Sequence, residues 1–350
     1  MKAIVKVSAG PGAELRETEV PRPGPGEVLI KVKAASICGT DFHIYRWDEW
    51  SAHRIKPPLI MGHEFCGDIV EIGPGVQEDL RVGDYVSAET HVVCGQCYQC
   101  RTGQSHVCSN TKILGVDRDG CFAEYIVIPG RNAWRNSATL PADVASMQEP
   151  LGNAVHTALY YPLTAQTVAV VGCGPIGLCA VGIARAAGAQ KVWAADVNPY
   201  RLELARHMGA HRLIASDRED LAKVLREETD GLGVDILLEM SGHPAAIRAG
   251  LAGTRSGGKV VMLGLPSAPL EVDLGNEVVM RGLTVQGITG RRVWETWYQA
   301  KALLDSGVLD VRPLITHRLP LEEFELGMEL MRRAECGKVV LYPGGVPADS

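Results

Sequence analysis

The sequence predicts an α/β chain of two domains, one a doubly wound parallel sheet of six strands and the other a β-rich domain. In the second half, near-continuous apolar runs alternate with helical segments, as buried parallel strands require. In the first half, short alternating runs are separated by glycine- and proline-rich turns. The chain has 350 residues, of which 46% are hydrophobic, so it holds enough apolar material for two cores.

The six strands expected in the second half follow one another from Ala154 onward. They are placed at 168–171, 192–196, 212–215, 234–239, 259–264 and 284–288. Parallel neighbours need crossover connections, and the segments between these runs have the apolar periodicity of helices.

The first half contains alternating runs at 28–32, 67–72 and 125–128, with turns at 23–26 and 73–75 between them. From residue 291 the chain is expected to add a helix around 294–306 and a last strand at 338–342, and to return to the first domain. The predicted domains are therefore 1–153 together with 291–350, and 154–290.

Charge and hydropathy narrow the list of partners. The chain has 35 Lys and Arg against 41 Asp and Glu, a net charge of −6, and its basic residues are scattered. No stripe of positive charge is present for a nucleic acid or an anionic membrane surface. No apolar run reaches the roughly 18 residues of a spanning helix, and the first residues have no signal-peptide core. We expect a cytoplasmic protein with neither a nucleic acid nor a membrane as partner.

A glycine motif follows the first strand of the second half. Gly172, Gly174 and Gly177 fall between that strand and an apolar helical run, in the pattern of a Rossmann dinucleotide-binding turn. The first glycine permits a tight turn, the second lets a pyrophosphate approach the backbone, and the third lets the helix pack on the strand. The alternative is that these glycines only make a close turn.

Asp196 ends the second strand, about 20 residues beyond the motif, where a carboxylate can accept hydrogen bonds from the ribose hydroxyls. A carboxylate there would repel a 2′-phosphate, which favours NAD over NADP. Arg201 is the nearby residue that complicates this choice, because it could meet such a phosphate.

Four cysteines have the spacing C-x2-C-x2-C-x7-C: Cys94, Cys97, Cys100 and Cys108. Four thiolates so spaced predict a closed, tetrahedral, structural zinc site in a lobe at 90–112. The alternative is four unrelated thiols in a loop, which would be prone to oxidation. The other cysteines, except Cys38, are expected to be inert packing residues.

A second set of candidate metal ligands is dispersed over three segments. Cys38 lies in the first, His63 and Glu64 in the second, and Glu149 in the third. Spacing alone says little here, because a lone His or Cys is more often a core or surface residue.

Four motifs follow one another along the chain: Cys-Gly-Thr-Asp at 38–41, Gly-His-Glu at 62–64, the four-cysteine lobe and the glycine motif. In this order they resemble the motifs of the zinc-containing medium-chain alcohol dehydrogenases. The resemblance covers nearly the whole chain and implies a GroES-like fold for the first domain. Longer blocks at 37–45, 149–157, 287–291 and 294–298 are similar to the threonine-oxidising branch of that family.

The resemblance implies roles for the dispersed residues. Cys38, His63 and Glu64 would bind a catalytic zinc, with Glu149 close enough to exchange with water or relay protons. Whether Glu64 or water occupies the resting metal is open. Thr40 and His43 would form the proton relay, although Thr40 could instead cap the helix that begins after Gly39.

The same resemblance implies which residues line the NAD groove at the carboxyl ends of the strands. Besides the three glycines, these are Ile176, Asp196, Arg201, Leu263, Gly264, Leu265, Ile288 and Thr289. With two zinc ions per chain, one catalytic and one structural, these assignments complete the expected cofactors.

The implied reaction is the NAD-dependent oxidation of L-threonine at its 3-hydroxyl to 2-amino-3-oxobutanoate. The close alternative is a polyol dehydrogenase of the sorbitol or 2,3-butanediol type. A more distant one is a non-catalytic NAD-binding protein, which has no need of Cys38, His63, Glu64 and Glu149 together. Relatives in the family are commonly tetramers, so a homotetramer is expected.

Overall fold

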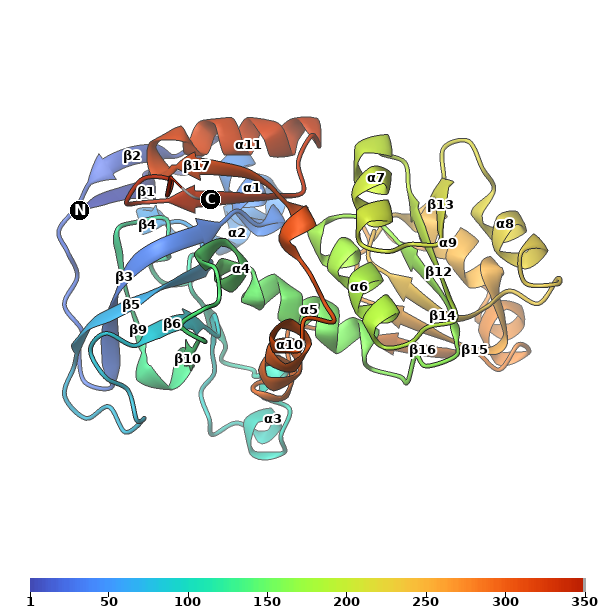
Figure 1. Ribbon diagram of the computed structural model, residues 1–350, viewed down its shortest axis with the longest axis horizontal. Coiled ribbons are helices and arrows are strands. Elements are labelled where there is room, and N and C mark those ends of the chain that lie inside the picture. Colours follow the sequence, from blue (N-terminus) through green and yellow to red (C-terminus); the bar gives the residue numbers. More distant parts are fainter. Residues whose placement is uncertain (349–350) are drawn as a thin grey trace. The chain divides into compact units, whose positions relative to one another are not determined.

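The computed structural model describes residues 1–348, which form two compact units (Figure 1). The first consists of Met1–Glu149 together with Ile315–Ser350, and the second of Pro150–Leu314. The sequence placed 1–153 and the whole segment 291–350 with the first unit, whereas in the structure the first unit ends at Glu149 and resumes only at Ile315.

Contacts made by residues 291–314 explain this difference. Arg291 donates a hydrogen bond to Asn153 Oδ1 at 3.2 Å, and the carbonyl of Gly290 lies 2.8 Å from His156 Nδ1. A side chain at Gly182 would meet Leu309, so that the segment packs against helix α6 (Pro175–Ala186) as well. These contacts hold 291–314, including α10 (Glu295–Asp305), in the second unit.

The second unit is built on one parallel sheet of six strands. In chain order they are β11 (Thr167–Val171), β12 (Lys191–Asp196), β13 (Arg212–Ala215), β14 (Val234–Glu239), β15 (Thr254–Met262) and β16 (Thr284–Gly287). The order across the sheet is β13-β12-β11-β14-β15-β16, and every pairing is parallel. The six predicted strands and the doubly wound order are confirmed, and the order reverses between β11 and β14.

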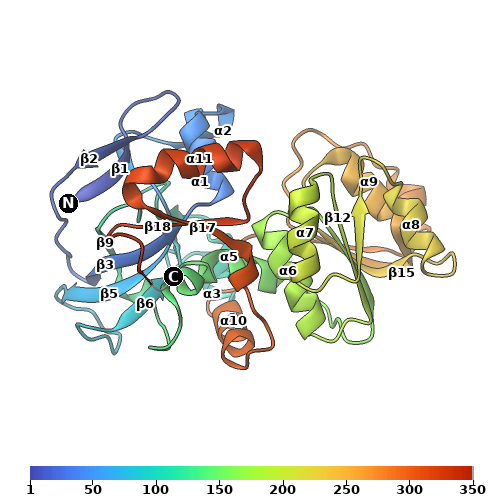
Figure 2. The same cartoon turned by 45° about the horizontal axis from the view of Figure 1, so that its top comes forward.

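Four helices connect these strands: α6, α7 (Pro199–His207), α8 (Leu221–Glu227) and α9 (Pro244–Gly253) (Figure 2). Three of them begin with a proline, which suits the first helical position because its missing N–H has no partner there anyway. Helix α6 is buried from Gly177 to Ala184, because its residues there are apolar or small on every face.

The first unit is β-rich, as predicted. Its main sheet has the order β10-β6-β5-β3-β18-β17, with β9 also paired to β3. These strands are β3 (Glu27–Ser36), β5 (Glu64–Ile72), β6 (Tyr85–Ala88), β9 (Tyr125–Pro129), β10 (Ala133–Arg135), β17 (Ile315–Pro320) and β18 (Lys338–Tyr342). A smaller sheet has the order β2-β1-β4, with β1 (Lys2–Lys6), β2 (Glu14–Glu17) and β4 (Leu59–Ile60).

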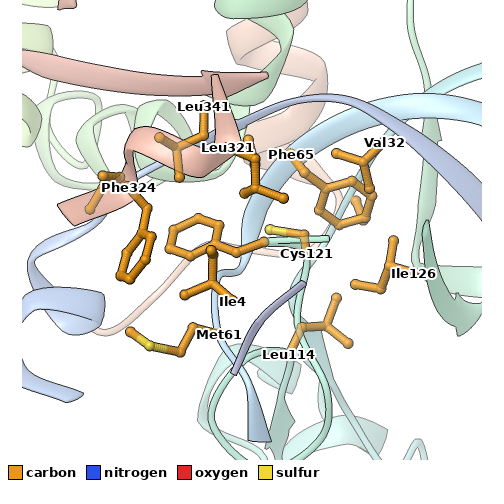
Figure 3. Packing of buried hydrophobic residues seen from close by; sticks show 14 of the residues in the cluster. Ile4, Val32, Met61, Phe65, Leu114, Cys121, Ile126, Leu321, Phe324 and Leu341 are labelled. Atoms are coloured by element: carbon orange, nitrogen blue, oxygen red, sulfur yellow. The ribbon is translucent and has the colours of Figure 1, made fainter. Parts of the chain in front are cut away.

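The C-terminal strand completes the first unit. β18 pairs antiparallel with β3, so that Val340 lies opposite Ser36, and this confirms the predicted return of the tail. Helix α11 (Phe324–Arg333) precedes β18. The core brings together residues from both ends of the chain, including Ile4, Phe65 and Leu341 (Figure 3).

No helix within residues 1–348 combines the length and the apolar character that a membrane crossing demands.

Candidate functional site

The four-cysteine lobe is a short excursion with little regular structure. It runs from β7 (His91–Val92) through α3 (Tyr98–Arg101) to β8 (Lys112–Ile113), which pairs with β7 and closes the lobe. All four thiols are free rather than in disulfides. Their sulfur atoms all lie within 4.8 Å of one another.

The sulfur spacing fits a tetrahedral metal ion. Cys97 Sγ lies 3.8 Å from Cys108 Sγ, which lies 3.6 Å from Cys94 Sγ. Four sulfurs placed tetrahedrally at the usual zinc–sulfur distance of about 2.3 Å would be about 3.8 Å apart. A disulfide would need about 2.05 Å, so the arrangement suits zinc and not a covalent bond.

Backbone amides stabilise negative charge on these sulfurs. Cys97 N–H donates to Cys94 Sγ at 3.4 Å, and Asn110 N–H to Cys108 Sγ at 3.3 Å. Hydrogen bonds from the Cys100 and Ser109 amides lower the pKa of Cys97 to about 5, while burial and the neighbouring thiols raise the pKa of Cys100 to about 12. Negatively charged sulfurs this close together repel one another, and a shared divalent cation removes that repulsion.

The second metal-ligand cluster is assembled from separate elements of the first unit. Cys38, His63 and Glu64 each offer one ligand atom, and these atoms lie within 4.8 Å of one another. Cys38 is the N-cap of α1 (Gly39–Arg46), in an extended conformation that follows β3. His63 and Glu64 lie where the chain enters β5, and Glu64 is opposite Ser36 in the β3–β5 pair.

A glycine makes the bend that presents His63. Gly62 has φ +90°, which favours glycine, and a Cβ there would lie 2.2 Å from the ring of Phe122. The bend therefore packs directly against the segment around Phe122 and aims the next two side chains inward.

Glu64 is fully buried but anchored on one side only. Its Oε2 is ion-paired with Lys338 Nζ and accepts a hydrogen bond from Ser36 Oγ. Its Oε1 has no hydrogen-bond partner. Burial raises the pKa of Glu64 against the opposing effects of Lys338 and His63. An orphaned buried carboxylate oxygen is costly unless a cation meets it, so the residues present fit a metal ion.

His63 is oriented by a second buried carboxylate. Its Nδ1 lies 3.5 Å from Asp41 Oδ1, and each of these atoms is otherwise unpartnered. Burial lowers the pKa of His63, but the negative charges of Asp41 and Cys38 outweigh it and raise that pKa well above its ordinary value. Positive charge is thus strongly favoured at this point, and a ring held by a carboxylate at Nδ1 can offer Nε2 to a metal.

Asp41 also stabilises the start of α1. As the third residue of α1 it accepts a hydrogen bond from the Cys38 N–H at 2.8 Å, which closes the first turn. Its contact with His63 was not foreseen, because nothing in the local sequence brings residue 63 beside residue 41.

Glu149 lies near this cluster without belonging to it. It is buried, it accepts a hydrogen bond from Thr90 Oγ1 at 3.1 Å, and its charge raises the pKa of both Glu64 and Lys338. It is not one of the three residues whose ligand atoms lie within 4.8 Å. Its position supports a role beside the metal rather than on it.

Helix α1 presents Thr40 and His43 one turn apart. Thr40 Oγ1 lies 3.8 Å from Cys38 Sγ, whereas the side chain of His43 is 52% exposed. Residues at i and i+3 share a helix face, so Thr40 beside the cluster and the exposed His43 lie on the same side of α1. Cys38 and not Thr40 occupies the N-cap, so Thr40 is not used as the cap.

In the second unit, the glycine turn has the geometry that its motif predicts. Gly172 has φ +95°, and a Cβ there would lie 2.7 Å from the backbone of Ser241. A Cβ on Gly177 would lie 1.9 Å from the carbonyl oxygen of Gly172, whereas one on Gly174 would point into open space. Gly174 is the N-cap of α6, and because Pro175 has no N–H the free N–H groups of the first turn begin at Ile176, where an anionic pyrophosphate can bind.

The carboxylate of Asp196 fixes the rim of the same turn. Its Oδ2 accepts the Cys173 N–H at 2.7 Å and its Oδ1 the Asn198 N–H at 2.8 Å. Arg201 lines the same cavity, and its buried Nε has no hydrogen-bond partner. The cavity, of about 560 Å³, is therefore lined by groups of both signs.

Of the predicted cofactor residues, Gly172, Gly174, Asp196 and Arg201 line this cavity. Ile176 and Gly177 lie in the first turn of α6. Leu263, Gly264 and Leu265 follow β15, while Ile288 and Thr289 follow β16. All five are at the carboxyl ends of strands, and their part in cofactor binding stays a prediction.

The cavity also has a lining that the sequence reasoning missed, including Ser216, Met240, Ser241 and His243. Ser216 follows β13 directly, and Met240 and Ser241 follow β14. Ligands of open parallel sheets bind at such carboxyl ends, so the positions after every predicted strand were the signal that could have found them.

Comparison with known proteins agrees with this geometry. Residues 24–138 match the model of the alcohol dehydrogenase GroES-like domain, and residues 175–306 match that of the zinc-binding dehydrogenases. A protein of Symbiobacterium thermophilum named L-threonine 3-dehydrogenase is 55% identical over 98% of both chains.

Two solved structures resemble the whole chain. One, from Sinorhizobium meliloti, is described as a putative zinc-binding dehydrogenase bound to NADP; its TM-score is 0.89 at 30% identity, covering 98% of this chain and 99% of its own. The other, from Escherichia coli, is described as a short chain alcohol dehydrogenase complexed with NADH; its TM-score is 0.89 at 31% identity, with the same coverage. The chain therefore belongs to the zinc-containing medium-chain alcohol dehydrogenase family, and within it to the group of L-threonine 3-dehydrogenases.

Proposed function

We propose that this protein oxidises L-threonine at the 3-hydroxyl, with NAD as hydride acceptor, to 2-amino-3-oxobutanoate, NADH and a proton. The observation that carries the proposal is the buried Cys38, His63 and Glu64 cluster, with its orphaned carboxylate oxygen and its strong preference for positive charge. The relative from Symbiobacterium thermophilum supports the substrate by its name.

The cofactors supply the central chemistry: a bound zinc ion acts as a Lewis acid on the alcohol oxygen, and NAD accepts the hydride. Cys38, His63 and Glu64 would hold the ion, and Asp41 would fix the orientation of His63. A second zinc in the four-cysteine lobe would fix the loop between β7 and β8. With all four lobe positions taken by thiolates, no room is left there for a substrate.

Proton movement falls to the chain's own side chains. The hydroxyl proton would pass to Thr40 Oγ1 and from there to His43, which is exposed enough to release it to solvent. Glu149, anchored by Thr90, would act beside the ion, either by exchange with water or as a proton relay. Neither role requires a ligand position on the metal.

The cofactor preference rests on Asp196. Its carboxylate lines the cavity beside the glycine turn, where it would accept hydrogen bonds from the ribose hydroxyls and repel a 2′-phosphate. Arg201 lines the same cavity and favours the opposite choice. The two related structures contain NADP and NADH, so the preference is a property of each sequence and must be measured.

The test is a spectrophotometric assay of NADH formation with L-threonine, sorbitol and 2,3-butanediol as alternative substrates. We expect the highest kcat/KM for L-threonine with NAD and a lower value with NADP. Faster turnover of either polyol would replace the substrate assignment. The expected tetramer is a separate prediction, which light scattering coupled to gel filtration measures directly.

A further inference from the structure

The helix that bears Thr40 and His43 ends in an unusual way. Trp47 follows α1 in the left-handed region, with φ 60°, and its N–H closes the turn on His43 O at 3.0 Å. A left-handed conformation is costly for a bulky residue and persists only where the surroundings fix it. Here Lys6 Nζ lies 4.8 Å from the centre of the Trp47 ring and also binds the Gly12 carbonyl at 2.7 Å.

This turn places the next residue, Asp48, beside His43 of α1. Asp48 Oδ2 lies 2.5 Å from His43 Nδ1, close enough for a strong, charge-assisted hydrogen bond. The other oxygen, Oδ1, accepts the backbone N–H and the hydroxyl of Ser51, both at 3.0 Å, and so caps α2 (Glu49–Arg54). The two oxygens of this carboxylate therefore have separate roles: Oδ2 binds His43, and Oδ1 caps α2.

The geometry points to Asp48 as the positioning residue of the proton relay: its carboxylate holds Nδ1–H of His43 and so leaves Nε2 as the ring nitrogen able to accept a proton from Thr40. A carboxylate can only accept at Nδ1, so it selects the tautomer with the proton there. The inference rests on the proposed function, because it assigns a role within the Thr40–His43 relay.

The groups around Asp48 keep its carboxyl group ionised, as this role requires. Burial raises its pKa, but hydrogen bonds from Ser51 and His43 outweigh burial, so that the pKa of Asp48 is lowered. Arg46 Nη2 lies 3.7 Å from Oδ2. From the facing helix α11, Glu325, Glu329 and Arg332 line the same groove. Asp48 is therefore a carboxylate across the neutral range, and it orients the His43 ring without taking the proton itself.

The substitution Asp48→Asn separates the role in capping α2 from the role in holding His43. Asparagine is as good an N-cap as aspartate, so Oδ1 can still cap α2. Its amide nitrogen would face His43 Nδ1 as a donor, which forces that nitrogen to accept and moves the proton to Nε2. The matched control is Glu49→Gln, which removes an exposed negative charge one residue away, on α2.

Two measurements on these variants test the role. In the protein without substrate, nitrogen NMR of the His43 ring, assigned by comparison with His43→Gln, should show the Nδ1–H tautomer in the wild type and in Glu49→Gln, and the Nε2–H tautomer in Asp48→Asn. In the threonine assay, kcat/KM of Asp48→Asn should fall about 10- to 100-fold. Adding Asp48→Asn to His43→Gln should cost nothing further.

The result that would overturn the inference is an Asp48→Asn protein with the wild-type tautomer, or with the same kcat/KM as Glu49→Gln. The NMR measurement needs no turnover, so it still tests the role of Asp48 if L-threonine proves not to be the substrate.

Discussion

The two metal-ligand clusters of the first unit reach similar donor spacings by opposite routes. In the lobe, four thiols come from one short segment, three of them partly exposed, and backbone amides stabilise their charge. In the other cluster, Cys38, His63 and Glu64 come from two segments, two of them are buried, and other side chains hold them in place. The lobe offers the four ligands of a closed site, whereas the other cluster offers three, one fewer than a tetrahedral zinc ion takes.

This difference teaches what a reactive metal site requires. A closed set of four thiolates needs little support, because the ion itself organises the loop. A three-ligand site must keep its geometry while the fourth position changes, and Asp41, Ser36 and Lys338 supply that support here. The comparison therefore predicts that damage to the lobe reduces stability and damage to the buried cluster reduces activity.

The largest expected effect is on turnover. Cys38→Ser should lower kcat/KM for L-threonine by about a thousand-fold or more, because Lewis-acid assistance contributes several kcal/mol to such a reaction. The melting temperature should change little, since Cys38 is the N-cap residue of α1 and is outside the main core. Steady-state kinetics and a thermal melt measure the two quantities, and near-normal turnover would remove Cys38 from the site.

Cys94→Ser should show the reverse pattern. Losing one thiolate opens the lobe, so the melting temperature should fall by several degrees while activity in the cold is largely kept. Calorimetry and an assay at low temperature measure this. If Cys94→Ser instead abolished turnover with an unchanged melt, the two clusters would have exchanged roles.

Next in size is the cost of unpairing Glu64. Lys338→Met leaves a fully buried carboxylate without its cation, which typically costs about 3–5 kcal/mol of unfolding free energy. The matched control is Lys33→Met, whose ion pair with Asp68 is 2.8 Å long and largely exposed, and which should cost about 1 kcal/mol or less. Equal losses in denaturant titrations of the two variants would show that Lys338 does not support Glu64.

The smallest effect concerns protonation in the lobe. With zinc removed, Cys97 has a pKa of about 5 and Cys100 one of about 12. A thiol with a lowered pKa is a thiolate above that value and loses its charge as the pH falls through it. At pH 7, iodoacetamide should therefore alkylate Cys97 before Cys100, and the difference should vanish below about pH 5. Mass spectrometry of the chelator-treated protein measures this order; alkylation of Cys100 first would contradict the lobe geometry.

The sequence predicted these regions unequally well, for physical reasons. The lobe could be predicted because its four ligands are close in sequence. The six parallel strands could be predicted because burial on both faces requires near-continuous apolar runs. The glycine turn was readable because each glycine has a steric reason in its own segment.

The supports of the buried cluster were not readable. Lys338 reaches Glu64 only because β18 pairs with β3, and β3 with β5, and no local pattern encodes that meeting. Asp48 was missed because its contact with His43 depends on one left-handed residue, Trp47. The boundary at residue 314 was missed because buried contacts, rather than composition, decide it.

The most direct test of the account is the zinc content of the purified protein, measured by mass spectrometry together with that of Cys38→Ser. The account predicts two zinc ions per chain in the wild type and one in the folded variant, with the remaining ion in the four-cysteine lobe. One ion per chain in both proteins would contradict it, because the buried cluster of Cys38, His63 and Glu64 would then not be a metal site.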